Sequence, residues 1–395
     1  MRATARRETP APLPDTASVH DAADRQAQSS SIRWIDRPAV DLPFYIGAAL
    51  VGWAMLIAHV VGHVSALALY WFWILFLDGP HLWATISRTY FDREERQKRR
   101  ALLRGAFAWA LLPLATIAWG FASGQRLPFF LFLVFAQLWA YWHVVRQHYG
   151  FLSLYQRKGG EPTGRQNPVD YAAFYTVMLA PFVSFALRHP TARRDLGLPA
   201  IMSAPERAIH VVTLVATALA LVAYAVKEYR RTRREGFNAG KNLFLLACVP
   251  LHLVALLHPT WSTTMNILAL SVVVTSFHNI QYNAIVWSYG RRRYADASEA
   301  SRFGAAPRLF QSVFVWYLLG AGLTVAFRYT TWAFDGRFWP FAPAATSLRG
   351  PFTATEYVNT LWWVVAIHHY YIDQKIWRPS RDAAVRHGLG LKLAA

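Results

Sequence analysis

The chain has 395 residues, of which 54% are hydrophobic and only 16% are charged, well below the ~25% charge of soluble domains. Its formal net charge is +19, yet it has no Gly-Lys phosphate loop and no basic motif interleaved with aromatic residues, so we expect no nucleic-acid partner. A single cysteine, Cys248, excludes an internal disulfide and a thiolate metal cluster within one chain.

The chain divides into three parts by composition. Residues 1–36 are polar, rich in Ala, Pro, Ser and Asp, and lack an apolar core segment, which indicates a disordered cytoplasmic tail and not a signal peptide. Residues 37–378 form the expected transmembrane helical domain. Residues 379–395 form a basic C-terminal tail. We find no repeat of fixed period and no soluble catalytic domain.

Long uncharged stretches predict an all-α, polytopic helical bundle. The stretch 243–290 has no Lys, Arg, Asp or Glu, and the only charge in 43–86 is Asp78. Each is long enough for two spans at about 20 residues a span. In chain order we expect ten spans, at about 42–61, 64–87, 103–122, 128–150, 169–187, 207–226, 242–258, 262–289, 309–328 and 354–377.

Basic residues predict the orientation of these spans. The connections after spans two, four, six and eight and the C-terminal tail are all basic, and they share one side if both termini are cytoplasmic. The connection after span five, with Arg193 and Arg194, argues the other way. Arg88 and Arg378 are expected to reach lipid head groups. We therefore expect a multi-pass protein of the bacterial inner membrane, in contact with membrane lipids.

Polar residues recur inside four of these apolar spans. Spans two, four, eight and ten carry them, and the orientation places all of them in the cytoplasmic half of the membrane. They are Asp78 and His81; His143, Gln147 and His148; His278 and Gln281; and His368, His369 and Asp373. A polar group in hydrocarbon needs a partner, so we expect these residues to share one.

Imidazole and carboxylate on facing helices are typical of a metal site in a helical bundle. Residues three or four apart share a helix face, which lets two side chains of one span reach the same ion. We therefore predict a metal site with its ligands among eight residues, namely Asp78, His81, His143, His148, His278, His368, His369 and Asp373. Gln147 and Gln281 would position a bound water, dioxygen or the substrate.

His143 and His148 are a special case because they are five residues apart, about 140° from a common helix face. A local π-bulge could bring them together. Otherwise one of the two is a ligand and the other contacts the substrate or a neighbouring helix.

Other interpretations stay open at this point. The same residues could form a proton path or simple structural hydrogen bonds. A lone intramembrane histidine such as His252 more often donates a hydrogen bond between helices than binds a metal. His59 and His63 have HxxxH spacing but fall at the outer end of span one. They could be structural, form a second site on the outer side, or indicate other bounds for the first two spans, and we favour the structural role.

The histidine pattern resembles that of the histidine-box membrane oxygenases, which include fatty-acid desaturases and alkane hydroxylases. The resemblance is carried by His59 with His63, His143 with His148, and the pair His368-His369. It implies a di-iron centre at the cytoplasmic face that activates dioxygen against a C–H bond of an apolar substrate. The chain departs from desaturases in having no HxxHH box and about twice their number of spans.

These observations predict an integral-membrane, metal-dependent oxidoreductase of the oxygenase, hydroxylase or desaturase type, acting on a lipid-soluble substrate. Iron, as a di-iron centre, is the expected cofactor, and zinc, copper or haem stay open. Because no flavin, NAD or iron–sulfur motif is present, electrons would come from an external donor. The alternatives are a proton-coupled transporter and a bis-histidine haem protein that transfers electrons.

Overall fold

A computed structural model describes the backbone of residues 33–334 and 348–391. Most of the polar N-terminal tail and the last four residues lie outside these ranges. The described chain is a helical bundle with one pair of two-residue antiparallel strands, β1 (Leu348–Arg349) and β2 (Phe352–Thr353). The all-α class predicted from the composition is confirmed.

The helices of the first half begin and end close to the predicted spans. In order they are α2 (Pro38–Val40), the π-helical η1 (Asp41–Ile46), α3 (Ala49–Val60), α4 (Ala66–Trp73), the π-helical η2 (Ile74–Asp78), α5 (Gly79–Thr89), α6 (Arg93–Lys98), α7 (Arg100–Ser123) and α8 (Leu127–Lys158).

The second half continues the bundle. Its main helices are α9 (Pro168–Arg188), α10 (Pro190–Asp195), α11 (Ala204–Glu235), α12 (Ala239–Leu257), α13 (Trp261–Thr264), α14 (Ile267–Arg293), α17 (Val313–Phe334), α18 (Ala354–Ile376) and α19 (Ala383–Gly388). Short helical turns complete the connections, namely η3 (Gly164–Gln166), η4 (Ala297–Glu299), α15 (Ala300–Phe303) and α16 (Ala306–Leu309).

Within the described residues, six helical segments are long and apolar enough to cross a membrane, which fits a membrane protein. They are 38–60, 100–123, 127–158, 168–188, 204–235 and 239–257. The other four predicted spans are also helical, as α4–η2–α5, α14, α17 and α18. Three of these four carry the polar residues singled out above, which lower their hydropathy. The count of ten spans and the position of the termini stay predictions.

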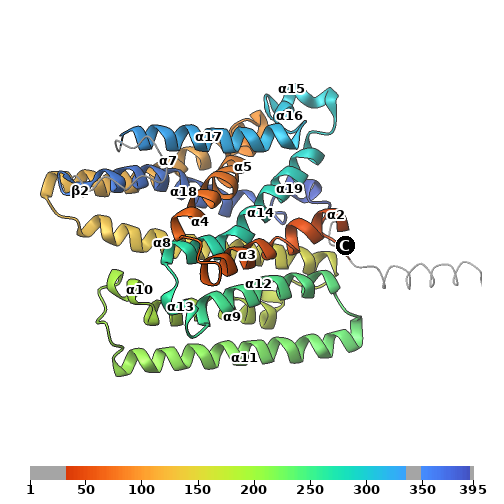
Figure 1. Ribbon diagram of the computed structural model, residues 1–395. Helices are drawn as coiled ribbons and strands as arrows, with labels where there is room; N and C mark the ends of the chain where they lie inside the picture. The colour runs from red at the N-terminus through yellow and green to blue at the C-terminus, as the bar shows by residue number, and fades with distance from the viewer. Residues whose placement is uncertain (1–32, 335–347, 392–395) are drawn as a thin grey trace, which may run out of the picture.

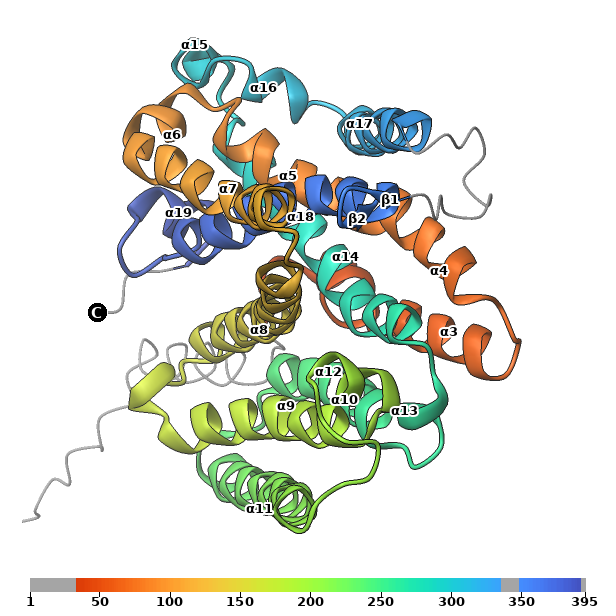
Figure 2. The same ribbon diagram turned by 90° about the vertical axis from the view of Figure 1, so that its left-hand side faces the viewer.

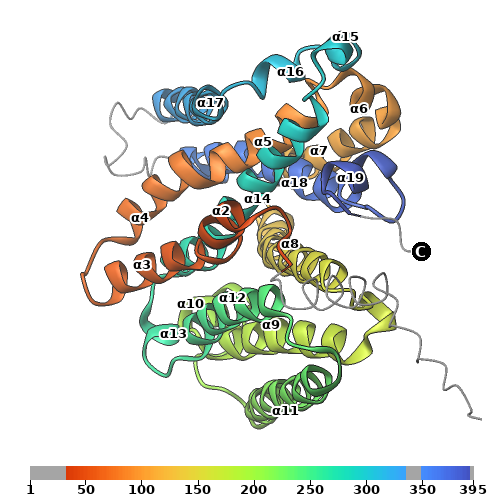
Figure 3. The same cartoon turned by 90° about the vertical axis from the view of Figure 1, so that its right-hand side faces the viewer.

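Helix α14 lies at the centre of the bundle and packs against α3, α4, α5, α8 and α12. Helices α11 and α17 lie at opposite edges, as Figures 1, 2 and 3 all show. The main apolar core includes Phe244 and Leu251 of α12 with Val273 and Phe277 of α14. Helices α5 and α8 therefore have α14 as a neighbour, and α18 reaches it through the ring contact of His369 with Tyr282.

Helix α5 approaches α17 very closely. A side-chain carbon added at Gly79 would overlap Thr324, and one added at Gly320 would approach Trp83 and Pro80. Small residues allow such close contact between membrane helices. The π-helical turn η2 ends at Asp78, and Pro80 follows at the start of α5, where its missing N–H costs least. This junction sets the face on which His81 emerges.

A buried charge network joins α11 to the bundle. Lys241 is fully buried, and its ammonium lies 2.8 Å from Glu161 and 2.5 Å from Glu228. Lys227 contacts Asp170 of α9 at 2.9 Å. Most of α11 otherwise exposes apolar side chains such as Val212 and Leu219, as expected of a lipid-facing helix. The network therefore adds specific polar contacts to the packing of α11 against α9.

We predict that Lys241→Met destabilises the protein by about 3–5 kcal/mol, because two buried carboxylates lose their shared cation. Chemical or thermal unfolding in detergent measures the effect. Arg230→Met is the control, since Arg230 is an exposed cation on α11, the helix that the network joins to the bundle, and it should leave the unfolding midpoint unchanged. Equal stability of the two variants would show that the network does not hold α11.

Candidate metal centre

Four helices bring four imidazole rings to one point in the bundle. The rings belong to His81 of α5, His143 of α8, His278 of α14 and His369 of α18, which we call the imidazole cluster, and all four side chains are buried. His81 Nε2 lies 2.8 Å from His369 Nε2 and 3.3 Å from His278 Nε2. His369 Nε2 lies 3.2 Å from His143 Nε2. The four Nε2 atoms therefore form one continuous series of contacts, in the order His278, His81, His369, His143.

Hydrogen bonds alone do not account well for this row of nitrogens. A neutral imidazole has one N–H and one lone pair. Three consecutive Nε2···Nε2 contacts require N–H and lone pair to alternate along the row, so one N–H of His81 or His369 would have to serve two acceptors at once. Protonating a ring instead would place an extra positive charge in a buried apolar site.

A cation among these rings accounts for the short contacts. The potential ligand atoms form two overlapping groups, His81 with His143 and His278, and His143 with His369 and Asp373. A metal–nitrogen bond of about 2.0–2.1 Å places neighbouring ligand nitrogens about 2.9 Å apart in octahedral geometry and about 3.3 Å apart in tetrahedral geometry. The three separations, 2.8, 3.2 and 3.3 Å, span this range. Each ring would then direct its Nε2 lone pair to the ion and carry its proton on Nδ1.

Asp373 adds a carboxylate to the cluster. Its Oδ2 lies 3.9 Å from His143 Nε2, and candidate ligand atoms of His143, His369 and Asp373 all lie within 4.8 Å of one another. Among the described residues, Asp373 Oδ1 has no hydrogen-bond partner of acceptable geometry. Asp373 thus offers an oxygen ligand one helical turn after His369.

A series of hydrogen-bonding groups lies on the Nδ1 side of the His369 ring. His369 Nδ1 lies 2.8 Å from Thr85 Oγ1, and Thr85 Oγ1 lies 2.6 Å from the hydroxyl of Tyr282. If His369 binds an ion through Nε2, its Nδ1–H donates to Thr85, whose own proton then points to Tyr282. Such a bond fixes the tautomer of a ligand histidine and increases its basicity. Tyr370 also stacks on His143, with ring centroids 4.7 Å apart.

Arg88 lies beneath this series of groups and does not reach the lipid head groups. Its side chain is fully buried, with the guanidinium 3.6 Å from the Trp377 ring centroid and 4.3 Å from that of Tyr289. It also donates to the Ile376 carbonyl at 3.3 Å. The expected lipid contact is therefore wrong for Arg88, since cation–π contacts hold it between α14 and the end of α18.

The structure does not bring His368 and Asp78 to the imidazole cluster. His368 Nε2 lies 2.7 Å from the Tyr90 hydroxyl, on the other side of α18 from His369. Asp78 accepts a hydrogen bond from Asn279 at 3.2 Å. Adjacent residues of a helix point about 100° apart, which explains why His368 and His369 separate.

The two predicted glutamines each donate a hydrogen bond to a backbone carbonyl of another helix. Gln147 donates to the carbonyl of His278 at 2.8 Å, and Gln281 donates to the carbonyl of Tyr45 at 2.8 Å. In the described part of the chain, the Oε1 atom of each has no hydrogen-bond partner. These oxygens are thus available to accept a hydrogen bond, whereas the amide nitrogens are used for helix packing.

His143 and His148 point in different directions. Helix α8 is a continuous α-helix through both residues, so the sequence provides no π-bulge there. His143 faces the imidazole cluster. His148 instead faces α12, where candidate ligand atoms of His148, Cys248 and His252 lie within 4.8 Å of one another. The sequence did not predict Cys248 and His252 as ligands of one site, although their spacing of four residues puts both on one helix face.

The outer HxxxH lies apart from these groups. His59 Nδ1 contacts the Val64 carbonyl at 2.8 Å, and His63 is exposed with a φ of 52°. Both line a shallow pocket with Trp261. Within the described residues, neither joins a group of three potential metal ligands.

Comparison with protein-family models, curated proteins and solved structures finds no match to this chain. The geometry of the site alone therefore carries the functional reasoning. Thr85 was not among the predicted site residues, although it follows His81 by four residues and so shares its helix face.

We predict that Thr85→Val weakens metal binding about 10–100-fold, because His369 loses the acceptor for its Nδ1–H. Competition against a chelator with purified protein measures the affinity. Thr89→Val is the matched control, since Thr89 is also buried on α5 and its hydroxyl donates to the Thr85 carbonyl at 2.6 Å. If both variants lose the same affinity, the effect is on the helix and not on His369.

Proposed function

We propose that this chain is an integral-membrane oxidoreductase that holds one non-haem iron ion at the imidazole cluster and acts on a lipid-soluble substrate. The single observation that carries the proposal is the series of three Nε2···Nε2 contacts of 2.8–3.3 Å that joins four buried histidines. We further propose the bacterial inner membrane as its location, with both termini cytoplasmic, on the basis of the basic connections.

The donor set suits a borderline transition metal. Four imidazole nitrogens with one carboxylate oxygen match the ligands that iron, zinc and copper accept, and iron among them provides redox chemistry. A bound iron ion would supply the one-electron and dioxygen chemistry that the side chains lack. We keep zinc and copper as outcomes of metal analysis.

The cluster favours a mononuclear ion over the di-iron centre implied by the resemblance. The potential ligands form two overlapping groups that share His143, and Asp373 is the one carboxylate grouped with them among the described residues. A haem is also disfavoured here, because axial nitrogens on opposite faces of a porphyrin stand about 4 Å apart with the ring between them. His81 and His369 are in direct contact at 2.8 Å.

The residues around the cluster have distinct roles in this proposal. Thr85 and Tyr282 hold the proton of His369 on Nδ1 and keep Nε2 free for the ion. Asp373 provides negative charge that partly balances the cation. The surrounding apolar helices exclude water, which protects a reactive site from solvent.

The surroundings of the site indicate where an apolar substrate would enter, and the sequence indicates that electrons would come from another protein. Exposed apolar residues of neighbouring helices, such as Phe107 and Trp142, face the membrane phase from which an apolar substrate would come. Electrons would come from a separate donor, because we find no flavin, NAD or iron–sulfur motif in the sequence.

A proton-coupled transporter is the second candidate, favoured by the row of contacts itself. The sequence His278, His81, His369, Thr85, Tyr282 is an unbroken series of polar contacts of 3.3 Å or less. Such a series can pass protons without any metal. The two candidates differ in whether the purified protein contains metal.

We predict that the detergent-purified protein contains close to one iron per imidazole cluster and shows no Soret band. Elemental analysis and an optical spectrum measure both. Protein free of metal that translocates protons in vesicles would favour the transporter, and a Soret band would establish haem in place of the non-haem ion.

His143→Ala and His369→Ala should each lose this iron, whereas His59→Ala should retain it because His59 lies apart from the cluster. His368→Ala is the closest control, since His368 neighbours His369 but contacts Tyr90. Loss of iron from His59→Ala or His368→Ala to the same extent would contradict the assignment of ligands.

A further inference from the structure

A second group of potential ligands lies on the other side of His278, formed by His148 of α8 with Cys248 and His252 of α12. We call it the thiol–imidazole group. All three side chains are fully buried, and their candidate ligand atoms lie within 4.8 Å of one another. Cys248 and His252 are four residues apart on one face of α12.

The imidazoles of this group have unused lone pairs. In the described part of the chain, neither ring nitrogen of His148 has a hydrogen-bond partner of acceptable geometry, although the Gln281 side chain lies nearby. His252 Nε2 has no partner either. Buried polar nitrogens without partners are costly, and an ion that accepts the one lone pair of each neutral ring removes part of that cost.

The hydrogen bonds of Tyr141 fix the tautomer of His252. The Tyr141 hydroxyl donates to the carbonyl of Met178 at 2.9 Å, and the same oxygen lies 3.3 Å from His252 Nδ1. Because its proton is already used, the hydroxyl oxygen accepts from Nδ1–H. His252 Nε2 is therefore left with its lone pair, as in a ligand histidine with a supporting acceptor.

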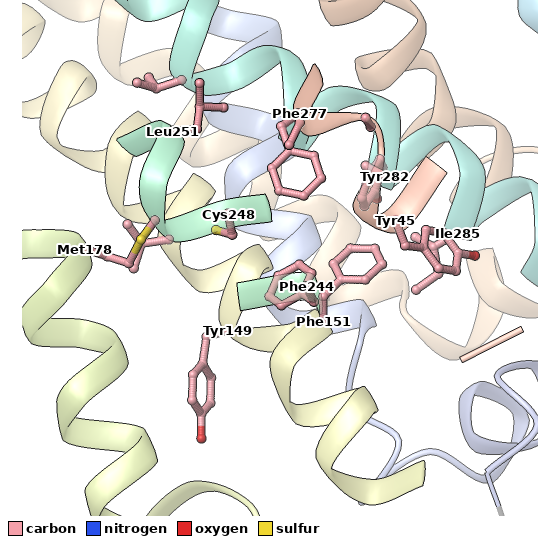
Figure 4. Packing of buried hydrophobic residues seen from close by; sticks show 14 of the residues in the cluster. Tyr45, Tyr149, Phe151, Met178, Phe244, Cys248, Leu251, Phe277, Tyr282 and Ile285 are labelled. Atoms are coloured by element: carbon pink, nitrogen blue, oxygen red, sulfur yellow. The ribbon is translucent and has the colours of Figure 1, made fainter. Parts of the chain in front are cut away.

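The surroundings are apolar and tightly packed. Figure 4 shows Cys248 in the interior near Met178, Leu251 and Phe244, and all four belong to the main core. Pro250 interrupts the backbone hydrogen bonding of α12 between the two ligands. A buried free cysteine is usually a small apolar core residue, and the unpartnered imidazoles beside it are what distinguish this one.

We propose that His148, Cys248 and His252 form a second metal site, which takes a thiophilic divalent ion such as zinc. Two neutral imidazoles and one thiolate are typical zinc ligands, and three protein ligands leave a fourth position open. On binding, the Cys248 thiol releases its proton to solvent, and the Cys248 sulfur forms the bond to the ion. The thiolate also distinguishes this site from the imidazole cluster, which has only nitrogen and oxygen donors.

The two sites are neighbours but separate. The ring of His148, in the thiol–imidazole group, and the ring of His278, in the imidazole cluster, have centroids 6.3 Å apart. Helices α8 and α14, which carry these two residues, therefore meet between the two sites. The second site does not depend on the proposed oxidoreductase activity, because it shares no ligand with the imidazole cluster.

Cobalt(II) is the probe that tests the second site, because a cobalt–thiolate bond produces an intense near-ultraviolet charge-transfer band that nitrogen and oxygen ligands do not. We expect the band when full-length, chelator-treated protein in detergent is titrated with cobalt(II), and we expect His369→Ala to retain it. Cys248→Ser should abolish the band, and His252→Gln should weaken cobalt binding at this site at least 10-fold.

Leu251→Ala is the matched control, since Leu251 is a fully buried neighbour on α12 and its truncation tests for general loosening. It should keep the band. No band in the wild-type protein, or an unchanged band in Cys248→Ser, would overturn the proposal. Loss of the band in Leu251→Ala to the same extent as in Cys248→Ser would also overturn it. Absence of iron with the band retained would contradict only the proposal for the imidazole cluster.

Discussion

Four imidazole nitrogens that face one another in an apolar interior are the constraint around which this bundle is arranged. Each ring comes from a different helix, so α5, α8, α14 and α18 must all approach one point, and α14 must be central. An unpartnered buried nitrogen is costly. The close contact of Gly79 with α17 and the π-helical turn before His81 are local departures from regular helix packing that serve this approach.

Two buried polar regions of the bundle differ in how far their polar groups are paired. Around Lys241, opposite charges meet directly, and the ammonium has carboxylate partners on two sides. Around His81 and His148, several nitrogens remain without partners within the described residues. In the first region the charged groups are paired with one another, although Asp170 Oδ1 has no hydrogen-bond partner among the described residues. In the second, the unpartnered atoms include Nδ1 of His81 and of His278 and both ring nitrogens of His148, so the described protein groups alone do not satisfy these rings.

The sequence identified the helices and most of the polar residues, but it did not determine how those residues are grouped. Apolar length and charge predicted the segments, and histidines within them predicted His81, His143, His278 and His369 as one set, which the structure places together. His148 and His368 were predicted in the same set because depth along a span can be read from sequence, whereas the rotation of each helix depends on packing. Cys248 and His252 were each judged alone, and only the fold shows them beside His148.

The position of His369 on α18 determines when the imidazole cluster can form during synthesis. His81 and His143 are made early, and His278 follows only after α9, α11 and α12 have been added. The fourth ring, His369, is synthesised with α18, after the three helices that carry the other cluster histidines. Until then the earlier histidines lie in a half-built bundle with an incomplete donor set. If the cluster holds an ion as we propose, its metallation is therefore a late step of biogenesis, separate from membrane insertion.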